Sequence, residues 1–479
     1  MYLCVPQKKI LYIVALIKSI SGIRGTIGGK PGEGLSPIDI VRFSAAFGTW
    51  IKQKNKSKKT LVIVGRDARI SGDMLSRLVT GTLNGLGIDV IDTGLSTTPT
   101  VEMAVPAEKA QAGIILTASH NPKQWNALKL LNEKGEFISA SDGEEVLGIA
   151  ASESFDFADV NHLGKTLPPK KDYIDEHIRK ILEIPIVDAG LIKAKNFKIV
   201  IDCVNSTGGI AVPRLLKALG VEQIVELFTT PDGDFPHNPE PLPENLNEIS
   251  KAVLKNKAHL GIVVDPDVDR LAIVSEDGEM FGEEYSLVAV ADYVLSGKKG
   301  AAVSNLSSTR ALRDVAEKHG CDYHASAVGE VNVVEKMKEC SAVIGGEGNG
   351  GIIYPELHYG RDALVGIALF LTHLAKFGKS CTMLRSKYPN YHISKNKIEL
   401  TREINVDDIL SGVKEKYKKQ PVNTIDGVKI EFDNEWVHLR KSNTEPIIRI
   451  YAESEFVTTA DNLSEKIITD IRELIKKKV

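Results

Sequence analysis

The sequence predicts an α/β fold with three successive α/β domains that have mixed sheets, followed by a smaller C-terminal α+β domain. In the first three domains, short apolar runs typical of buried strands alternate with helical stretches, and glycine-rich polar loops follow the strands. The last segment has several strand-like runs before one charged helix, which is typical of a mostly antiparallel sheet. We set the domains at residues 1–160, 161–276, 277–390 and 391–479.

The composition is that of a globular protein that binds its ligand locally. Hydrophobic residues make up 43% and charged residues 26% of the chain, and a length of 479 residues suggests roughly three domains and accommodates four. Lys plus Arg number 60 and Asp plus Glu number 63, so the net charge is −3. No basic block is long enough for a nucleic-acid arm, so we expect no nucleic-acid partner.

The cysteines and the N-terminal segment indicate a cytoplasmic protein. The five cysteines are odd in number and far apart, without a CxxC pair, which favours a reducing compartment over a disulfide or zinc framework. The apolar run Ile10–Ile17 follows two lysines, as in a signal peptide, but it is far too short for a membrane span. We expect a first strand there, after a poorly ordered leader at residues 1–10, and no membrane partner.

The first domain begins with a glycine-rich stretch, Ser21–Gly29, that carries one arginine, Arg24. As a loop it would present backbone N–H groups and a guanidinium to an oxyanion, although a plain flexible loop fits the pattern equally well. It is neither a Walker loop nor a dinucleotide fingerprint. The other elements expected in this domain are helices at 36–53 and 73–86 and strands at Leu61–Val64, Val90–Ile91 and Gly113–Leu116.

A strand end in the first domain carries the first chemical signal. An apolar run stops at Thr117–Pro122, where the proline blocks both a helix and a continuing strand, so Ser119 and His120 should lie on a tight turn. A hydroxyl at a strand end beside an imidazole suits a nucleophile or a phosphate carrier. A polar turn that caps a helix is the alternative, and it is the commoner structure for an isolated Ser-His pair. Lys129 lies ten residues beyond Ser119.

The second domain follows a polar, proline-containing linker at 151–172. A strand at Phe197–Ile201 and a helix at 210–219 begin its α/β pattern. The stretch Pro231–Asn245 is so rich in proline that we expect an irregular ordered loop or a hinge there.

Three alternate carboxylates in this domain carry the second chemical signal. The buried strand Leu260–Val264 runs into Asp265, Asp267 and Asp269, followed by Arg270. Like charges this close are costly unless a cation lies among them, and oxygen-only ligands favour Mg²⁺. An EF-hand is excluded because Arg270 stands where that loop needs glycine and because a strand follows. An aspartyl-phosphate phosphatase loop remains as the rival interpretation.

The third and fourth domains each contribute one polar loop. In the third, which includes a strand at Ala301–Ser304, Glu347 and Asn349 lie among five glycines at Gly345–Gly351 and are suited to sugar hydroxyls, although the bare pattern is only a turn. Arg361 and Asp362 follow and are expected to pair with each other. The fourth domain is expected to have strands at Asn396–Leu400, Gly427–Phe432, Trp436–Arg440 and Ile447–Ala452 and a helix from Ala460 to the end.

The polar loop of the fourth domain lies between its last two strands. It begins at Arg440, and Arg449 lies beyond it. Hydroxyls, an amide and a guanidinium within one turn make a suitable phosphate cradle. The residues that supply them are Arg440, Ser442, Asn443 and Thr444.

The order of these four loops resembles that of the α-D-phosphohexomutase superfamily, which comprises phosphoglucomutases, phosphomannomutases and phosphoglucosamine mutases. The resemblance spans residues 18 to about 460, and the Thr-Ala-Ser-His-Asn-Pro motif at Thr117–Pro122 is its most specific part. It implies four domains around a central cleft, a phosphoserine at Ser119 and Mg²⁺ held by that phosphate and the three aspartates. A hexose 6-phosphate and its 1-phosphate would interconvert through a 1,6-bisphosphate, which would also serve as activator.

The resemblance also implies roles for single residues. Arg24, Lys129 and His120 would act at the transferring group, with Lys129 as general acid or base. Arg270 would help to neutralise charge. Residues that would bind the substrate are Glu347 and Asn349 at the sugar hydroxyls and Arg440, Ser442, Asn443, Thr444 and Arg449 at the non-reacting phosphate.

The chain departs from the family pattern at several positions. Pro266 replaces a usual glycine in the metal loop, and Asn349 with Gly350–Gly351 replaces Ser-Gly-His or Ser-Gly-Phe. Glu330 stands where many members have a histidine, and a carboxylate there would pair with the ammonium of glucosamine phosphate. We therefore favour phosphoglucosamine mutase, with phosphomannomutase or phosphoglucomutase, a Mg²⁺-dependent sugar-phosphate phosphatase and a silent binding protein as alternatives. A monomer or homodimer is expected.

Overall fold

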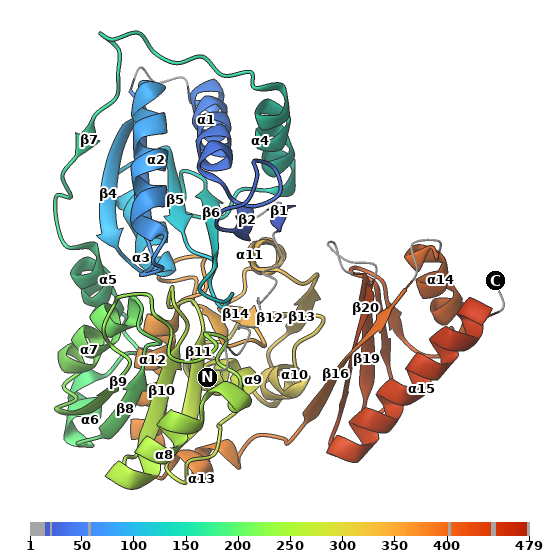
Figure 1. Ribbon diagram of the computed structural model, residues 1–479. Helices are drawn as coiled ribbons and strands as arrows, with labels where there is room; N and C mark the ends of the chain where they lie inside the picture. The colour runs from blue at the N-terminus through green and yellow to red at the C-terminus, as the bar shows by residue number, and fades with distance from the viewer. Residues whose placement is uncertain (1–14, 20–21, 56–58, 401–403, 442–446, 477–479) are drawn as a thin grey trace, which may run out of the picture.

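The computed structural model describes residues 15–19, 22–55, 59–400, 404–441 and 447–476, which form four β-sheets. In Figure 1 the first domain lies above the second and third, and the C-terminal domain stands to one side of the third. The predicted fold class is confirmed: the sheets of the first three domains are mixed, and that of the smaller C-terminal domain is antiparallel.

The first domain has a seven-stranded sheet in the order β1-β2-β6-β5-β3-β4-β7. Its strands are β1 (Leu16–Ser19), β2 (Gly22–Thr26), β3 (Leu61–Arg66), β4 (Asp89–Leu95), β5 (Ala112–Leu116), β6 (Trp125–Leu131) and β7 (Thr166–Leu167). Its helices are α1 (Pro37–Lys54), α2 (Gly72–Gly85), α3 (Thr98–Ala107) and α4 (Ala140–Ser152). Because β3 and β5 pair in parallel, the loops that follow them meet at one edge of the sheet.

Two expectations for this domain need correction. Within the expected loop Ser21–Gly29, Gly22–Thr26 form β2, which pairs antiparallel with β6 and places Arg24 on a strand. Lys129 also lies on a strand, β6, which the sequence analysis did not include. The expected strand at Ile10–Ile17 lies mostly outside the described residues, and the described β1 begins at Leu16.

The second domain has a four-stranded sheet in the order β11-β10-β8-β9. Its strands are β8 (Lys198–Asp202), β9 (Gln223–Leu227), β10 (Leu260–Val264) and β11 (Leu271–Ser275), and its helices are α5 (Tyr173–Leu182), α6 (Ala189–Ala194), α7 (Gly208–Ala218) and α8 (Asn247–Asn256). The strands β10 and β11 form an antiparallel hairpin that is closed by the three-aspartate loop. As expected, Pro231–Asn245 is irregular, apart from the 3₁₀ turn η1 (Pro243–Asn245).

The third domain has a four-stranded sheet in the order β13-β12-β14-β15. Its strands are β12 (Ala302–Asn305), β13 (Tyr323–Ser326), β14 (Ile344–Glu347) and β15 (Gly351–Ile353), and its helices are α9 (Glu283–Gly297), α10 (Ala311–Lys318), α11 (Glu330–Glu339), α12 (Ala363–Phe377) and α13 (Cys381–Arg385). One buried apolar cluster combines Leu215 of the second domain with Ile344 and Phe370 of the third. These two domains therefore share a core, whereas the first and fourth have separate cores.

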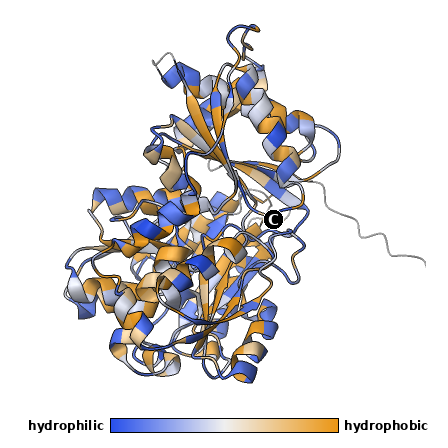
Figure 2. Ribbon diagram, turned by 90° about the vertical axis from the view of Figure 1, so that its left-hand side faces the viewer, coloured by the Kyte–Doolittle hydropathy of each residue, from blue (hydrophilic) through white to orange (hydrophobic). Residues whose placement is uncertain are grey.

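The fourth domain has a five-stranded antiparallel sheet in the order β16-β20-β19-β18-β17. Its elements are β16 (His392–Glu399), α14 (Val406–Lys416), β17 (Val422–Asn423), β18 (Val428–Glu431), β19 (Trp436–Lys441), β20 (Ile447–Ser454) and α15 (Val457–Lys476). The strand β17 and the helix α14 add to the predicted elements. In Figure 2, which views the molecule from the side of the first and second domains, the strands in front are mostly apolar and the helices carry polar residues on their outer faces.

None of the helices that the structure describes combines the length and apolar character needed to cross a membrane.

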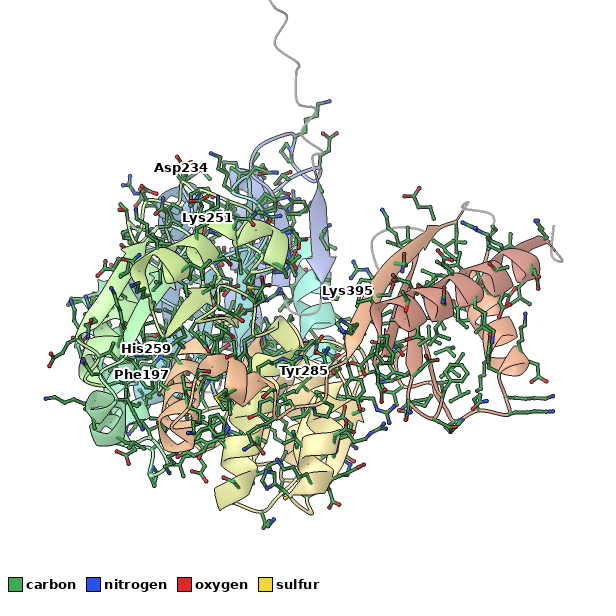
Figure 3. All side chains as sticks on the ribbon, turned by 90° about the horizontal axis from the view of Figure 1, so that it is seen from below. Phe197, Asp234, Lys251, His259, Tyr285 and Lys395 are labelled. Atoms are coloured by element: carbon green, nitrogen blue, oxygen red, sulfur yellow. The ribbon has the colours of Figure 1, made fainter. Side chains whose placement is uncertain are left out.

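A tyrosine of the third domain holds the link to the fourth. Tyr285, labelled in Figure 3 between the third domain and the C-terminal domain, accepts from the N–H of Tyr391 at 2.8 Å and donates to the carbonyl of Pro389 at 2.7 Å. This tyrosine therefore holds the segment that leads into β16. The described cysteines, Cys203, Cys321, Cys340 and Cys381, are free thiols.

A buried histidine lies where the third and fourth domains meet. The imidazole of His438 is 1% exposed, with Ser307 Oγ at 2.9 Å from Nδ1 and the carbonyl oxygen of Asp426 at 2.6 Å from Nε2. Because a carbonyl only accepts, Nε2 carries the proton. Burial lowers the pKa of His438 to about 4, against the opposite effect of the Asp426 carbonyl.

This pKa predicts acid sensitivity of the fourth domain. The folded-state pKa lies below the ordinary value of 6.5, so the stabilisation is present above pH 6.5 and is lost as the pH falls towards 4, by up to about 3 kcal/mol. We expect His438→Gln to weaken this pH dependence in urea unfolding, and His392→Gln, at a half-buried site of the same domain, to leave it unchanged. An unaltered pH dependence in His438→Gln would contradict the prediction.

Candidate active site

Ser119 lies on a strained turn directly after β5. Its φ of +48° is in the left-handed region, which is uncommon for residues other than glycine and costs on the order of 1 kcal/mol. The hydroxyl of Thr117 accepts from the Ser119 N–H at 2.9 Å and donates to Asp67 at 2.6 Å. The hydroxyl of Ser119 donates to Asp265 at 2.7 Å, so it points at the aspartate loop of the second domain.

The guanidinium of Arg69 holds this turn from behind. Its side chain is fully buried, and its Nε donates to Asp67 at 3.0 Å. The two terminal nitrogens donate to the carbonyl oxygens of Ser119, Asn121, Pro122 and Trp125. One planar donor group therefore fixes most of the Ser-His turn, which accounts for how the strained φ of Ser119 is maintained.

The three carboxylates of the aspartate loop converge. Asp265, Asp267 and Asp269 are fully buried, and a ligand oxygen of each lies within 4.8 Å of the others. Oδ1 of Asp265 accepts from the backbone N–H groups of Asp269 and Arg270, both at 3.1 Å. Val268, which lies between Asp267 and Asp269, has a φ of +63°, a strained conformation for a β-branched residue. This conformation bends the loop so that the carboxylates meet.

The unsatisfied oxygens of this loop fit a hard divalent cation. Oδ1 of Asp267 and Oδ1 of Asp269 are buried and have no hydrogen-bond partner among the described residues. Burial and the charges of Asp269 and Asp267 raise the pKa of Asp265 well above its usual range. A cation bound by the three carboxylates would satisfy the orphan oxygens and favour the ionised form of Asp265. The donors are all oxygen, which is the set that Mg²⁺ takes.

Cationic side chains surround the carboxylates. Nζ of Lys129 lies 2.7 Å from Asp267 and 3.3 Å from Asp269. Burial opposes its charge, but the two aspartates outweigh burial and raise the pKa of Lys129 above its usual range. Arg24 donates to Oδ1 of Asn121 at 3.0 Å, and burial together with the nearby charges of Arg270 and Arg69 lowers its pKa. Cations packed this closely make a site suited to an anion.

His120 lies beside the Ser119 hydroxyl, and the charge of Arg270 acts on His120. Nδ1 of His120 is 3.4 Å from Ser119 Oγ, and burial followed by the charge of Arg270 lowers its pKa to about 2, so the ring is neutral. Nε of Arg270 is buried and makes no hydrogen bond among the described residues, although its guanidinium lies 3.7 Å from Glu240. A donor of Arg270 is thus available to a bound phosphate.

Arg361 joins the aspartate loop to the glycine-rich loop of the third domain. Its guanidinium donates to Asp269 at 2.7 Å, to Glu347 at 2.9 Å and to Glu330 at 3.0 Å. A Cβ on Gly351 would lie only 2.3 Å from Cδ of Arg361, so glycine at that position makes room for this side chain. Arg361 therefore does not pair with Asp362, as the sequence suggested, because three carboxylates from outside its own segment take its donors.

The residues that the sequence analysis assigned to sugar recognition lie in or next to this network. Glu347 is 4% exposed and also accepts from Asn305 at 2.8 Å and from the N–H of Gly329 at 3.0 Å. Glu330 is buried and has both oxygens on Arg361, through its N–H at 2.9 Å and its Nε at 3.0 Å. In this structure Glu330 is a partner of Arg361 and not a free carboxylate awaiting an ammonium. Asn349 is half-buried and turns back to accept from the N–H of Gly351 at 3.2 Å.

The expected phosphate cradle is described only in part. Ser442, Asn443 and Thr444 lie outside the described residues. Arg440 projects from β19, where its Nε is 2.7 Å from Asp426, and Arg449 lies opposite it on β20 and is exposed. Neither arginine contacts the Ser119 group in the described structure, whereas Ser119, the three aspartates, Lys129, Arg24, His120, Arg270, Arg361 and Glu347 form one continuous network.

Comparison with known proteins identifies the family. Profiles of phosphoglucomutase/phosphomannomutase α/β/α domains I, II and III and of the C-terminal domain match residues 16–157, 173–278, 283–391 and 397–469. A phosphoglucomutase/phosphomannomutase of Thermococcus kodakarensis is 34% identical over 94% of this chain and 99% of its own. The chain belongs to the phosphoglucomutase/phosphomannomutase family.

Further relatives are consistent with this assignment. A phosphoglucosamine/phosphogalactosamine mutase of Sulfurisphaera tokodaii is 31% identical over 95% of this chain and 98% of its own. A family protein of Burkholderia thailandensis has a solved structure with a TM-score of 0.81 and 26% identity, covering 96% of this chain and 97% of its own. The relatives are named phosphomutases, so this chain is a member of an isomerase family of intramolecular phosphotransferases, the α-D-phosphohexomutase superfamily.

Sequence reasoning did not assign Arg69 or Arg361 to the candidate site. Arg69 lies in the polar loop that follows β3, and a loop after a parallel strand next to β5 was a signal that could have placed it near Ser119. Arg361 was named, but its partners lie at distant positions in the chain, so no local pattern predicts them.

The role of Arg69 predicts that a lysine at this position, which keeps the positive charge, does not support normal turnover. In Arg69→Lys a single ammonium cannot reach four carbonyls and Asp67, so we expect mutase turnover to fall by about a hundredfold through misplacement of Ser119. In urea unfolding, the free energy of unfolding of Arg69→Lys should be lower than that of the wild type by roughly 2–4 kcal/mol. Arg77→Lys, on the exposed face of α2, is the matched control. Turnover of Arg69→Lys equal to that of the wild type would refute the role.

Proposed function

We propose that this phosphomutase carries its phosphoryl group on Ser119 and interconverts glucosamine 6-phosphate and glucosamine 1-phosphate. The observation that supports the carrier role most directly is the hydrogen bond from the Ser119 hydroxyl to Asp265, at the edge of a buried carboxylate cluster and beside a group of arginines. Both oxygens of Asp265 are already engaged, Oδ1 by two backbone N–H groups and Oδ2 by Ser119, which favours Ser119 over Asp265 as the nucleophile.

The charges support phosphoryl transfer. A phosphoserine contributes about −1.5 to −2, and a substrate phosphate contributes a similar charge. The cations that would balance these groups are Arg24, Lys129, Arg270 and Arg361, together with Mg²⁺ at Asp265, Asp267 and Asp269. When bound, the metal ion would neutralise charge on the transferring phosphoryl group. Catalysis of this kind is mainly positioning and charge neutralisation.

The proposed transfer breaks the bond between phosphorus and the Oγ of Ser119 as the free 1- or 6-hydroxyl of the sugar forms its bond to phosphorus. Lys129 is held protonated by Asp267 and Asp269, so it donates a proton to the leaving Oγ and regains the one that the sugar hydroxyl releases. The 1,6-bisphosphate then turns over and returns its other phosphoryl group to Ser119. A hexose 1,6-bisphosphate would activate enzyme that has lost this phosphate. His120, which is neutral, would orient the Oγ.

The amino-sugar preference rests on two observations. Several archaeal relatives at about 30% identity carry phosphoglucosamine mutase names. Glu330 and Glu347 of the third domain share the guanidinium of Arg361, so two carboxylates lie beside the sugar loop and suit an ammonium group. Glu347 and Asn349 would contact the sugar, and Arg440, Ser442, Asn443, Thr444 and Arg449 would hold the non-reacting phosphate.

The proposed location is the cytoplasm. The free thiols are in keeping with this reducing compartment.

The proposal predicts a preference by charge. We expect kcat/KM for glucosamine 6-phosphate to exceed that for glucose and mannose 6-phosphates by about tenfold or more. N-acetylglucosamine 6-phosphate, which has an amide in place of the ammonium, is the matched control and should be a poor substrate. A strong preference for the neutral sugars would refute the amino-sugar assignment, and stoichiometric release of inorganic phosphate would support a phosphatase instead of a mutase.

A further inference from the structure

A second cluster of metal-ligand side chains lies where the first three domains meet, away from the three aspartates. Nε2 of His177 is 2.9 Å from Oδ2 of Asp362, and Nε2 of His358 is 3.3 Å from the same oxygen. The three ligand atoms all lie within 4.8 Å of one another. Ligands bound at about 2.0–2.2 Å to one ion are themselves roughly 3 Å apart, so a small closure onto an ion would complete this arrangement.

The outer nitrogens of both imidazoles have the partners that metal-bound histidines use. Nδ1 of His177 is 3.0 Å from the hydroxyl of Thr100, and Nδ1 of His358 is 3.4 Å from the carboxylate of Glu102. A carboxylate behind Nδ1 favours the tautomer in which Nε2 offers its lone pair to an ion, and the Thr100 hydroxyl can accept from Nδ1–H of His177. Both histidines therefore direct Nε2 to one point, with an oxygen atom behind each ring.

Asp362 is positioned for one further ligand bond. Its Oδ1 caps α12 by accepting from the N–H groups of Leu364 and Val365 at 2.8 and 3.3 Å. Oδ2 is left to face the two imidazoles, and the side chain has no exposed surface. The carboxylate is thus held by the helix end, and the orientation of Oδ2 does not depend on the histidines.

Glu102, which lies next to His358, is a buried carboxyl group without a hydrogen bond among the described residues. Glu102 is 1% exposed, and neither of its oxygens has a hydrogen-bond partner among the described residues. It lines a cavity of about 490 Å³ together with Thr100, His177 and His358. A buried carboxyl group without donors is costly, and a divalent cation behind the His358 ring would lower that cost by strengthening the contact from Nδ1–H to the carboxylate.

We propose that His177, His358 and Asp362 bind one divalent transition-metal ion of the Zn²⁺ or Co²⁺ type, with an open coordination position toward this cavity. Two imidazoles and one carboxylate suit such ions, whereas the oxygen-only aspartate cluster suits Mg²⁺. His177 comes from α5 of the second domain, and His358 and Asp362 come from the loop before α12 and from the N-cap of α12 in the third. Glu102 lies on α3 of the first domain, which Figure 1 shows next to α5. The ion would join the second and third domains next to the first.

The test measures metal binding and not activity, so it is independent of the proposed function. The full-length protein is stripped with a chelator, loaded with Zn²⁺ or Co²⁺ in excess Mg²⁺, and dialysed. We expect one retained equivalent by mass spectrometry of the metal and a visible Co²⁺ absorption typical of nitrogen ligation. His177→Gln and His358→Gln should lose both signals, and Glu102→Gln should weaken binding by about 10- to 100-fold.

The matched control is His373→Gln. Its imidazole also lies near a buried carboxylate, 3.5 Å from Asp292, but belongs to no converging ligand set among the described residues. This variant should retain the ion. Failure of the wild-type protein to retain any ion in Mg²⁺, or equal retention by His358→Gln, which changes a partly exposed loop residue, would overturn the proposal, because either result means that these side chains form only a hydrogen-bonded junction.

Discussion

The buried guanidinium of Arg361 determines how the two halves of the catalytic region fit together. It donates to Asp269 on the metal loop of the second domain and to Glu347 and Glu330 in the third. These two domains also share one apolar core, so the guanidinium adds a polar contact to an interface that is otherwise apolar packing. Removal of one partner from a buried ion pair typically costs about 3–5 kcal/mol, and here three carboxylates share one guanidinium.

The proposed catalytic groups are held in strained conformations by contacts from neighbouring loops of their own domains. Ser119 and Val268 both have positive φ values, and each lies in a loop fixed from outside: Arg69 holds the Ser119 turn, and Ser206 and Thr207 donate to the carbonyl of Pro266 at 2.7 and 2.8 Å. Such strain persists only where surrounding contacts over-determine it. The result is a hydroxyl and three carboxylates that are oriented toward one another before substrate arrives, which is what phosphoryl transfer requires.

Local pattern predicted the fold class and the loops that carry the chemistry, because strand periodicity and the sites after strand ends are local properties. It did not predict that Arg24 and Lys129 lie on neighbouring strands, since glycines at Gly22 and Gly25 resemble a loop in the sequence. Local pattern also could not predict which side chains pair with each other. Whether Glu330 faces a sugar or Arg361 is decided by a contact across 31 residues, and the pairing of His177 with Asp362 spans 185.

The most direct test of the account is the intact mass of the protein before and after incubation with glucose 1,6-bisphosphate, followed by peptide mapping. The account predicts a gain of about one phosphoryl group, located on Ser119, which is abolished in Ser119→Ala and not in the matched variant Ser76→Ala, a buried serine of α2. No phosphate on Ser119 under either condition would contradict the account. A phosphoryl group that is lost in Asp265→Asn while Ser119→Ala retains it would also contradict the account and would make Asp265 the nucleophile.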